Sequence, residues 1–227
     1  MLLSNTIKIV IRMTKIQSSD AVHEIHINGV DIANNEIYLV GEESYNSGAG
    51  IEEAAEPGVE YLMSNRFIKN LNILSKNTDN IITIHMKTCG GHWGEGMAIY
   101  DAIKACKNEV TIINYTHARS MSSLIFLAAD KRIMMPHSTY MIHEGTIHAG
   151  GTVKQFRTEA EQNEIAMKQM MNIYVEHLLT KSYWKGKSSA QIHNWLTKNM
   201  RDKEEFYMSA EEAVEYGFAD EIMEGYI

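Results

Sequence analysis

The sequence predicts an α/β fold in which a mostly parallel sheet is layered with helices. Short runs rich in β-branched residues alternate with longer stretches of helical periodicity, the strands at 36–41, 81–86 and 110–114 and the helices at 59–74, 97–107 and 120–129. This alternation is typical of parallel sheets, whose functional sites lie at the carboxyl ends of the strands. At 227 residues and 44% hydrophobic composition, the chain is long enough for one domain with a full core.

The charge and cysteine content exclude several classes of function. The formal net charge of -8 and the absence of a Lys/Arg cluster argue against nucleic acid and membrane surfaces as partners. No apolar run approaches the roughly 20 residues that span a bilayer, and the N-terminus lacks the pattern of a signal peptide. The two cysteines, Cys89 and Cys106, form no CxxC pair, so we expect a reducing, cytoplasmic location.

The remaining segments follow from local patterns. Apolar and polar residues alternate loosely over residues 1–30, which predicts an N-terminal hairpin arm or edge strand ahead of a single domain over 31–227. Residues 42–58 are predicted to form a polar loop. Further on, the sequence predicts strands at 132–135 and 139–142, a loop at 183–187, a helix at 190–198 and a capped helix at 209–214 that ends at Gly217.

A long helix is expected from about Thr152 to Leu179. Its apolar side comprises Val153, Phe156, Ala160, Met167, Met170, Met171, Tyr174 and Leu178. A small core cannot cover a helix of this length. We therefore expect part of it to pack against another subunit, where methionine side chains adapt well to an interface.

Ser120 stands at the start of the buried helix predicted over 120–129. Unpaired N–H groups and the positive end of the helix dipole converge at such a position, so negative charge developing beside the Ser120 oxygen would be stabilised. The residue is the best nucleophile candidate in the chain. The ordinary alternative is a helix N-cap, and this segment alone favours the cap.

Partners for a serine nucleophile occur at two other strand ends. His143 directly follows the strand 139–142 and could accept the hydroxyl proton, although position alone slightly favours an ordinary loop histidine. Gly90 and Gly91 follow the strand 81–86, where consecutive glycines let the backbone bend so that an N–H faces a reacting carbonyl. We assign the N–H groups of Gly91 and Met121 to an oxyanion hole. A plain tight turn is the alternative.

Four blocks in order carry a resemblance to a known family. They are Cys89-Gly90-Gly91-His92-Trp93-Gly94-Glu95-Gly96-Met97-Ala98-Ile99-Tyr100-Asp101, Ala118-Arg119-Ser120-Met121, Met141-Ile142-His143 and Met208-Ser209-Ala210-Glu211-Glu212-Ala213-Val214-Glu215-Tyr216-Gly217. Together they resemble the proteolytic subunit of the Clp protease, ClpP, over roughly residues 36–222. The resemblance reverses the preference for a cap at Ser120 and for a plain loop residue at His143.

The resemblance implies a ClpP/crotonase-type fold, in which a spiral of β-strands is layered with helices and a long helix protrudes for packing between rings. It also implies a homo-oligomer of two stacked heptameric rings, a tetradecamer, with protein substrates fed through an axial pore by an AAA+ ATPase unfoldase. Ser120 corresponds to the nucleophile, His143 to the general base, and Gly91 and Met121 to the oxyanion positions. Residues 1–30 would occupy the place of the pore-lining arm.

The sequence departs from the family pattern around the site. The serine block usually reads Gly-Gln-Ala-Ala-Ser-Met-Gly, whereas Arg119 here places a large cation beside Ser120, where it could bind a substrate carboxylate or obstruct the cleft. Cys89 stands where the family has a proline before the glycine pair, and Gly145 stands where it has a proline after the histidine. Substrate binding on either side of the site is therefore expected to differ.

Two carboxylates compete for the acid of the triad. Glu205 matches the family's aspartate by ungapped spacing, four residues before Ser209, and Asp202 matches its Arg-Asp pair only with a local insertion. Either carboxylate can orient a histidine and stabilise its imidazolium form. Spacing favours Glu205 over Asp202.

The leading hypothesis is a serine endopeptidase core of a chambered protease, acting without metal or cofactor. One alternative is a catalytically impaired ring subunit that assembles with an active partner, suggested by Arg119 and by the ambiguous acid. A less favoured alternative is a crotonase-type enzyme acting on acyl-CoA, because the folds are related. The histidines show neither HExxH nor Cys/His spacing, so a metal site is not expected.

Overall fold

The structure is a computed structural model that describes residues 19–40, 58–146 and 150–225. Within the arm expected at 1–30, the described residues form mainly a helix, α2 (Ser19–Asn28), and only Val30 belongs to an edge strand, β1 (Val30–Asp31). Asp20 in its first turn complements the helix dipole, and Gly29, at φ 64°, ends it. The arm's residues 1–18 and nearly all of the loop expected at 42–58 lie outside the described residues.

The sheet runs in the order β1-β2-β3-β4-β5-β8 and branches at β4. Its first strands are β1 (Val30–Asp31), β2 (Glu36–Val40), β3 (Ile82–Thr88) and β4 (Val110–Arg119). The first part of β4 pairs in parallel with β5 (Lys131–Met134), and its last residues, from His117 to Arg119, pair in parallel with β6 (Thr139–Ile142). The predicted turn after Asn114 is therefore wrong, because β4 continues to the residue before Ser120.

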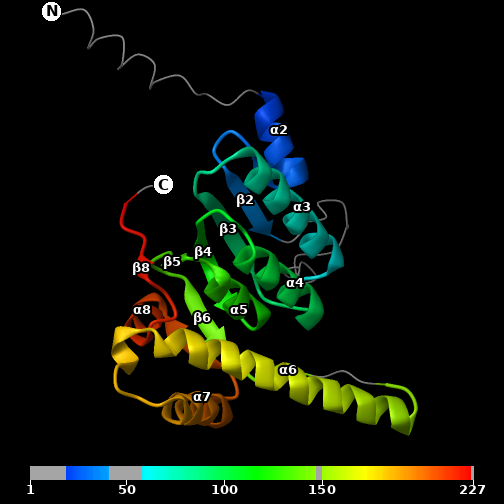
Figure 1. Ribbon diagram of the computed structural model, residues 1–227, viewed down its shortest axis with the longest axis vertical. Helices are drawn as coiled ribbons and strands as arrows, with labels where there is room; N and C mark the ends of the chain where they lie inside the picture. Colours follow the sequence, from blue (N-terminus) through cyan, green and yellow to red (C-terminus); the bar gives the residue numbers. More distant parts are fainter. Residues whose placement is uncertain (1–18, 41–57, 147–149, 226–227) are drawn as a thin grey trace, which may run out of the picture.

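Three helices cover one face of the sheet, as Figure 1 shows. They are α3 (Tyr61–Asn77), α4 (Trp93–Lys104) and α5 (Met121–Ala128), packed in that order. The β3 side chains Ile82, Ile84 and Met86 are fully buried beneath them. Every residue of α5 is buried, which fits a sequence that is apolar apart from Ser122 and Ser123.

Helix α4 begins four residues earlier than the sequence predicts. The glycine-rich stretch was expected to be a turn, but Gly94 and Gly96 are helical, and the His92 side chain caps the helix by accepting from the Glu95 N–H. A Cβ at Gly96 would collide with the side chain of Met121. Glycine at this position therefore lets α4 approach the start of α5, and it marks helix packing instead of a turn.

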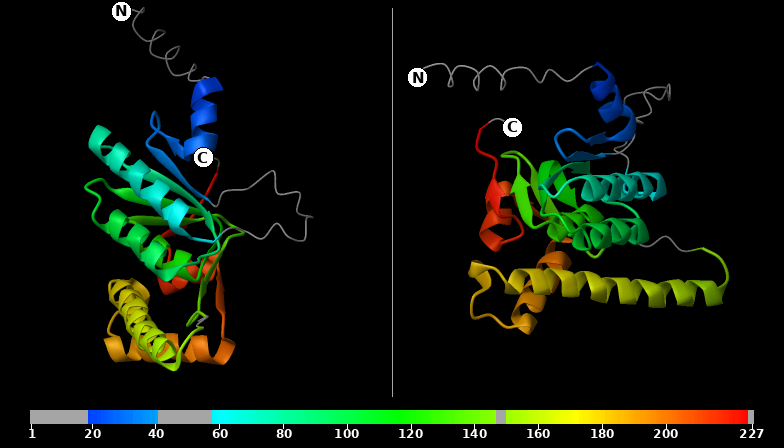
Figure 2. Two further views of the ribbon diagram at one scale, coloured as in Figure 1. Left: turned by 90° about the vertical axis from the view of Figure 1, so that its right-hand side faces the viewer. Right: turned by 45° about the horizontal axis from the view of Figure 1, so that its top comes forward.

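The long helix is confirmed as α6 (Val153–Leu179), and it projects well beyond the sheet in Figure 1 and in the right-hand view of Figure 2. Thr152 caps it in a reciprocal capping box with Gln155. All of its buried residues lie in the second half, from Met170 to Leu178, whereas Val153 and Phe156 are 69% and 57% exposed. The first half thus carries an apolar stripe that its own chain does not cover.

The C-terminal part contains two strands that the sequence analysis missed. After the short 3-10 helix η2 (Ser182–Trp184) and α7 (Ser189–Lys203), the chain forms β7 (Phe206–Ser209), which pairs antiparallel with β6. Helix α8 (Ala210–Tyr216) follows and ends at Gly217 as predicted, before β8 (Glu221–Ile222) pairs with β5. β8 has only two residues, too few for a periodic signal, and β7 is defined by its pairing with β6.

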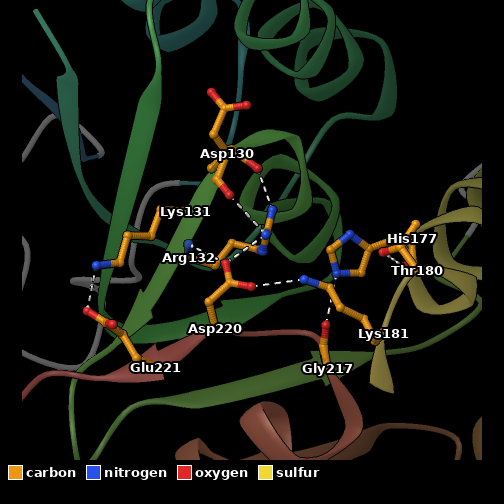
Figure 3. Close-up of polar contacts among 10 residues, drawn as sticks. Asp130, Lys131, Arg132, His177, Thr180, Lys181, Gly217, Asp220 and Glu221 are labelled. Carbon is orange, nitrogen blue, oxygen red and sulfur yellow. Dashed lines mark hydrogen bonds and ion pairs between the residues drawn. The ribbon is translucent and has the colours of Figure 1, made fainter. Parts of the chain in front are cut away.

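A polar network anchors the C-terminal end of α6 to the sheet edge (Figure 3). The buried guanidinium of Arg132 lies 2.6 Å from Asp220, which also pairs with Lys181 at 2.9 Å. Nearby, His177 Nε2 lies 2.9 Å from the Gly217 carbonyl oxygen. Burial, with a smaller contribution from Arg132, lowers the pKa of His177 to about 4, so this imidazole is neutral and donates to the carbonyl.

No helix in the described ranges is both long and apolar enough to cross a bilayer.

His177 should make the protein less stable as the pH falls from about 6.5 to about 4, since the unfolded chain takes up the proton first. Across this pH range the free energy of unfolding should fall by about 3 kcal/mol. Replacing His177 with Gln, which retains an N–H donor, should flatten this part of the profile. Denaturant melts across that range, at fixed protein concentration, measure the effect. An unchanged slope in H177Q would contradict the assignment.

Candidate active site

Ser120 occupies the junction between β4 and α5 in a strained backbone conformation, with φ 55° and ψ −130°. Non-glycine residues rarely adopt positive φ, and such outliers gather at functional sites. The side chain makes no capping bond to its helix. Its Oγ instead lies 2.8 Å from Nε2 of His143, the residue that follows β6. The geometry therefore departs from the N-cap alternative and is that of a nucleophile next to a base.

Buried hydrogen bonds hold the backbone of Ser120 in this conformation. Its N–H donates to the Met141 carbonyl at 3.2 Å, and its own carbonyl accepts from the Ser123 N–H at 3.0 Å and from the Ser123 hydroxyl at 2.6 Å. The Ser123 oxygen lies 2.5 Å from the hydroxyl of Tyr174 on α6, and Tyr140 donates to the Ser123 carbonyl at 2.9 Å. Met141 and Tyr174 are distant from Ser120 along the chain, so no local sequence pattern predicts these supports.

The two glycines after β3 are packed against the serine and against a neighbouring segment. A Cβ on Gly90, at φ 91°, would lie 2.7 Å from the Ser120 Cβ and 2.9 Å from the Met121 nitrogen. Val59 flanks the other side, donating to the Gly90 carbonyl at 2.6 Å and accepting from the His92 N–H at 2.8 Å. Only glycine fits this close approach.

Two backbone amides beside the serine remain available to a ligand. Within the part of the chain that the structure describes, the N–H groups of Gly91 and Met121 donate to no other group. Both residues line the same cavity as Ser120 and His143. An oxyanion hole needs such uncommitted donors next to the nucleophile.

His143 follows β6 and is half-buried. Burial is the main effect on its pKa, which it lowers; Glu205 raises the pKa, Arg119 lowers it further, and the net result lies below the ordinary imidazole value. The imidazole is therefore neutral at neutral pH. A neutral Nε2 facing a hydroxyl at 2.8 Å can act as a proton acceptor.

Of the two candidate acids, the structure brings Glu205 to the histidine and leaves Asp202 apart. Glu205 lines a cavity with His143 and raises its pKa. Asp202 lies in the last turn of α7, exposed and outside that cavity. No hydrogen bond joins Glu205 to the imidazole among the contacts of the described residues, so the carboxylate acts on His143 through its charge.

A tight turn places Glu205 at the start of β7. Glu204 has φ 60° and ψ −56°, and the Glu205 N–H donates to the Lys203 carbonyl at 2.6 Å. This is a γ-turn of the rare, strained type. Non-glycine residues with strained backbone conformations thus lie on both sides of His143, at Ser120 and at Glu204.

Cavities open on both sides of His143. The first, of about 810 Å³, is bounded by the glycine loop, the serine and the facing side of α6, with apolar lining from Trp93, Leu124, Met167 and Met170. The second, of about 940 Å³, lies between His143 and the α7–β7 connection and has a more polar lining that includes Glu205 and Tyr207. An extended peptide crossing the serine would have room on each side.

Arg119, the residue before the nucleophile, is partly buried and hydrogen-bonded to Tyr207 and to Cys89. Burial acts to lower its pKa, but these hydrogen bonds outweigh burial and the pKa is raised, so the guanidinium stays charged. Arg119 departs from the family pattern in the sequence, but no sequence pattern predicts that it contacts either of these residues. Among the described residues, no group of three or more His, Cys, Asp or Glu side chains is placed to hold a metal ion.

Comparison with known proteins gives one consistent result. A family model described as Clp protease matches residues 55–226. The ATP-dependent Clp protease proteolytic subunit of Streptococcus sanguinis is 35% identical over 178 residues, covering 73% of this chain and 81% of that protein. The corresponding subunit of Deinococcus radiodurans is 32% identical over 170 residues, covering 73% and 76%.

A solved structure, that of a point mutant of ClpP1 from Listeria monocytogenes, superposes with a TM-score of 0.65 at 25% identity, covering 86% of this chain and 94% of that one. The predicted fold class is thereby confirmed. The family match spans the strained serine, the histidine and the glycine loop described above. On these grounds the chain is a member of the Clp protease family, whose proteolytic subunits are serine peptidases.

Proposed function

We propose that this protein is the serine endopeptidase core of a chambered protease. The observation that carries the proposal is the 2.8 Å contact between Ser120 Oγ and His143 Nε2, made by a serine whose hydroxyl is not used as a helix cap. A merely structural serine at a helix start would cap the helix, as Ser188 and Ser209 do in α7 and α8.

The reaction follows from the placement of these groups. His143 takes the hydroxyl proton as Ser120 Oγ bonds to the peptide carbonyl carbon, and the N–H groups of Gly91 and Met121 stabilise the oxyanion. The C–N bond then breaks, and the amine leaves with the proton from His143. Water, deprotonated by His143, hydrolyses the acyl-enzyme. Glu205 stabilises the imidazolium formed in each step, an assignment supported by its effect on the pKa of His143.

We further propose assembly into two stacked heptameric rings served by an AAA+ unfoldase in the cytoplasm. The exposed apolar stripe on the first half of α6 supports packing against a second ring, because exposed apolar stripes mark interfaces. The family match supports pairing with a Clp ATPase. The two free cysteines support the reducing compartment.

The alternatives are weaker on particular grounds. A catalytically impaired ring subunit would not need the Ser120–His143 contact or the strained backbone that produces it. The relatives named above are proteolytic subunits, which gives no support to an enzyme of acyl-CoA.

A fluorophosphonate probe should label Ser120 of the purified full-length protein. Replacing Ser120 with Ala should abolish labelling and lower kcat for a short fluorogenic peptide by at least about a thousandfold, since the nucleophile is lost. The matched control is Ser188→Ala, which removes an exposed serine cap from α7 and should leave labelling unchanged. Wild-type protein that is neither labelled nor active would overturn the proposed function and favour the impaired subunit.

Substitution of each carboxylate separates the candidate acids. Glu205→Ala should lower kcat by about a hundredfold or more, because the imidazolium loses its counter-charge, while Asp202→Ala should stay within about twofold of wild type. Steady-state kinetics on the same peptide measure both. The opposite ranking would assign the acid to Asp202.

Charging the apolar stripe of α6 should separate the rings. Phe156→Glu places a carboxylate on the exposed stripe and should convert double rings into single rings, whereas Asn194→Glu, on the exposed side of α7, should leave the assembly intact. Negative-stain images and the particle mass report the outcome. Double rings in F156E would rule out this stripe as the ring contact.

A further inference from the structure

A row of side chains crosses three strands directly below the catalytic residues. Arg119 on β4 pairs with Met141 on β6, and Met141 pairs with Tyr207 on β7. Paired residues on neighbouring strands point to the same face of the sheet. Arg119 and Tyr207 therefore flank Met141, which is only 3% exposed, and the contact between them passes over it.

The catalytic residues lie one or two residues further along the same strands. Ser120 follows Arg119, His143 follows the β6 residue that pairs with Phe206, and Glu205 precedes Phe206. Any relative shift of β4, β6 and β7 would therefore change the spacing of nucleophile, base and acid.

The second contact of Arg119 reaches toward the opposite side of β4. Thr88 on β3 pairs with Ala118, which brings Cys89 next to Arg119, and Arg119 hydrogen-bonds to Cys89 as well as to Tyr207. Cys89 is the residue before Gly90 and Gly91. One guanidinium thus joins the start of the glycine loop to the strand that carries Glu205, and its planar fork of N–H donors suits two partners at once.

We infer that Arg119 is a positioning residue of the site, tying the oxyanion loop to the acid-bearing strand β7 across the nucleophile. This inference rests on the proposed peptidase function. It replaces the two roles suggested by the sequence, a substrate-carboxylate ligand or an obstruction, with contacts made inside the protein.

The charge of Arg119 has a separate measurable effect, which is on the pKa of His143. Burial lowers the pKa of His143 most, Glu205 raises it, and Arg119 lowers it. The other charged or titratable groups that share a cavity with His143 are His92, Glu144, Glu159, Arg201, Lys203, Glu204 and Tyr207. Because Arg119 is one of the groups that lower the pKa of His143, the direct effect of removing the guanidinium should be to raise that pKa.

The test compares Arg119→Ala, Arg119→Lys and Tyr207→Phe in the full-length assembled protein. R119A should lower kcat for a short peptide by about 10-fold to 100-fold with little change in KM, because the groups that act in the transition state lose their alignment. It should also move the acid limb of the kcat/KM profile to higher pH. R119K keeps the charge without the fork, so its acid limb should stay at the wild-type pH while kcat remains reduced.

Tyr207→Phe removes only the phenol oxygen, and it should lower kcat without moving the acid limb. Lys187→Ala, which removes an exposed cation before α7, is the matched control and should match wild type in both quantities. If wild-type protein is labelled at Ser120 but R119A keeps its kcat and its acid limb, the positioning role is wrong and the peptidase proposal stands. If wild-type protein is neither labelled nor active, both proposals fail.

Discussion

The backbone at Ser120, with its φ of 55°, is the constraint around which the rest of the site is organised. Positive φ turns the chain sharply from β4 into α5 and presents the hydroxyl to His143 instead of to the helix. Such a conformation costs of order 1–3 kcal/mol and persists only where surrounding contacts determine it. Those contacts come from β6 through Met141, from α6 through Tyr174 and from the glycine loop through Gly90.

Branching of the sheet at β4 brings these contacts together. Its first part pairs with β5, and its last residues turn to pair with β6, which in turn pairs with β7. Ser120, His143 and Glu205, the proposed nucleophile, base and acid, consequently stand at the ends of three adjacent strands. Glu205, the proposed acid, is reached through the γ-turn at Glu204, so it is held by a strained backbone, as Ser120 is.

Sequence patterns predicted most of the fold because the signals involved are local. Helix α6, the buried helix after Ser120 and the strand before His143 each follow from residues within one segment. The predictions that failed concern contacts between distant segments. Gly96, which lies within helix α4, packs against Met121, and β7 forms through its pairing with β6. The Ser123–Tyr174 bond and the Arg119 contacts were likewise beyond any local pattern.

The pairing of β6 with β7 also sets the order in which the site can form during folding. It joins Ile142 to Phe206, across the whole of α6 and α7. Closing so long a segment is entropically costly, and strand pairings of large sequence separation form slowly. A nascent chain that has folded only as far as β6 holds Ser120 and His143 without Glu205 or Tyr207. Completion of the catalytic group therefore waits for the C-terminal residues to leave the ribosome.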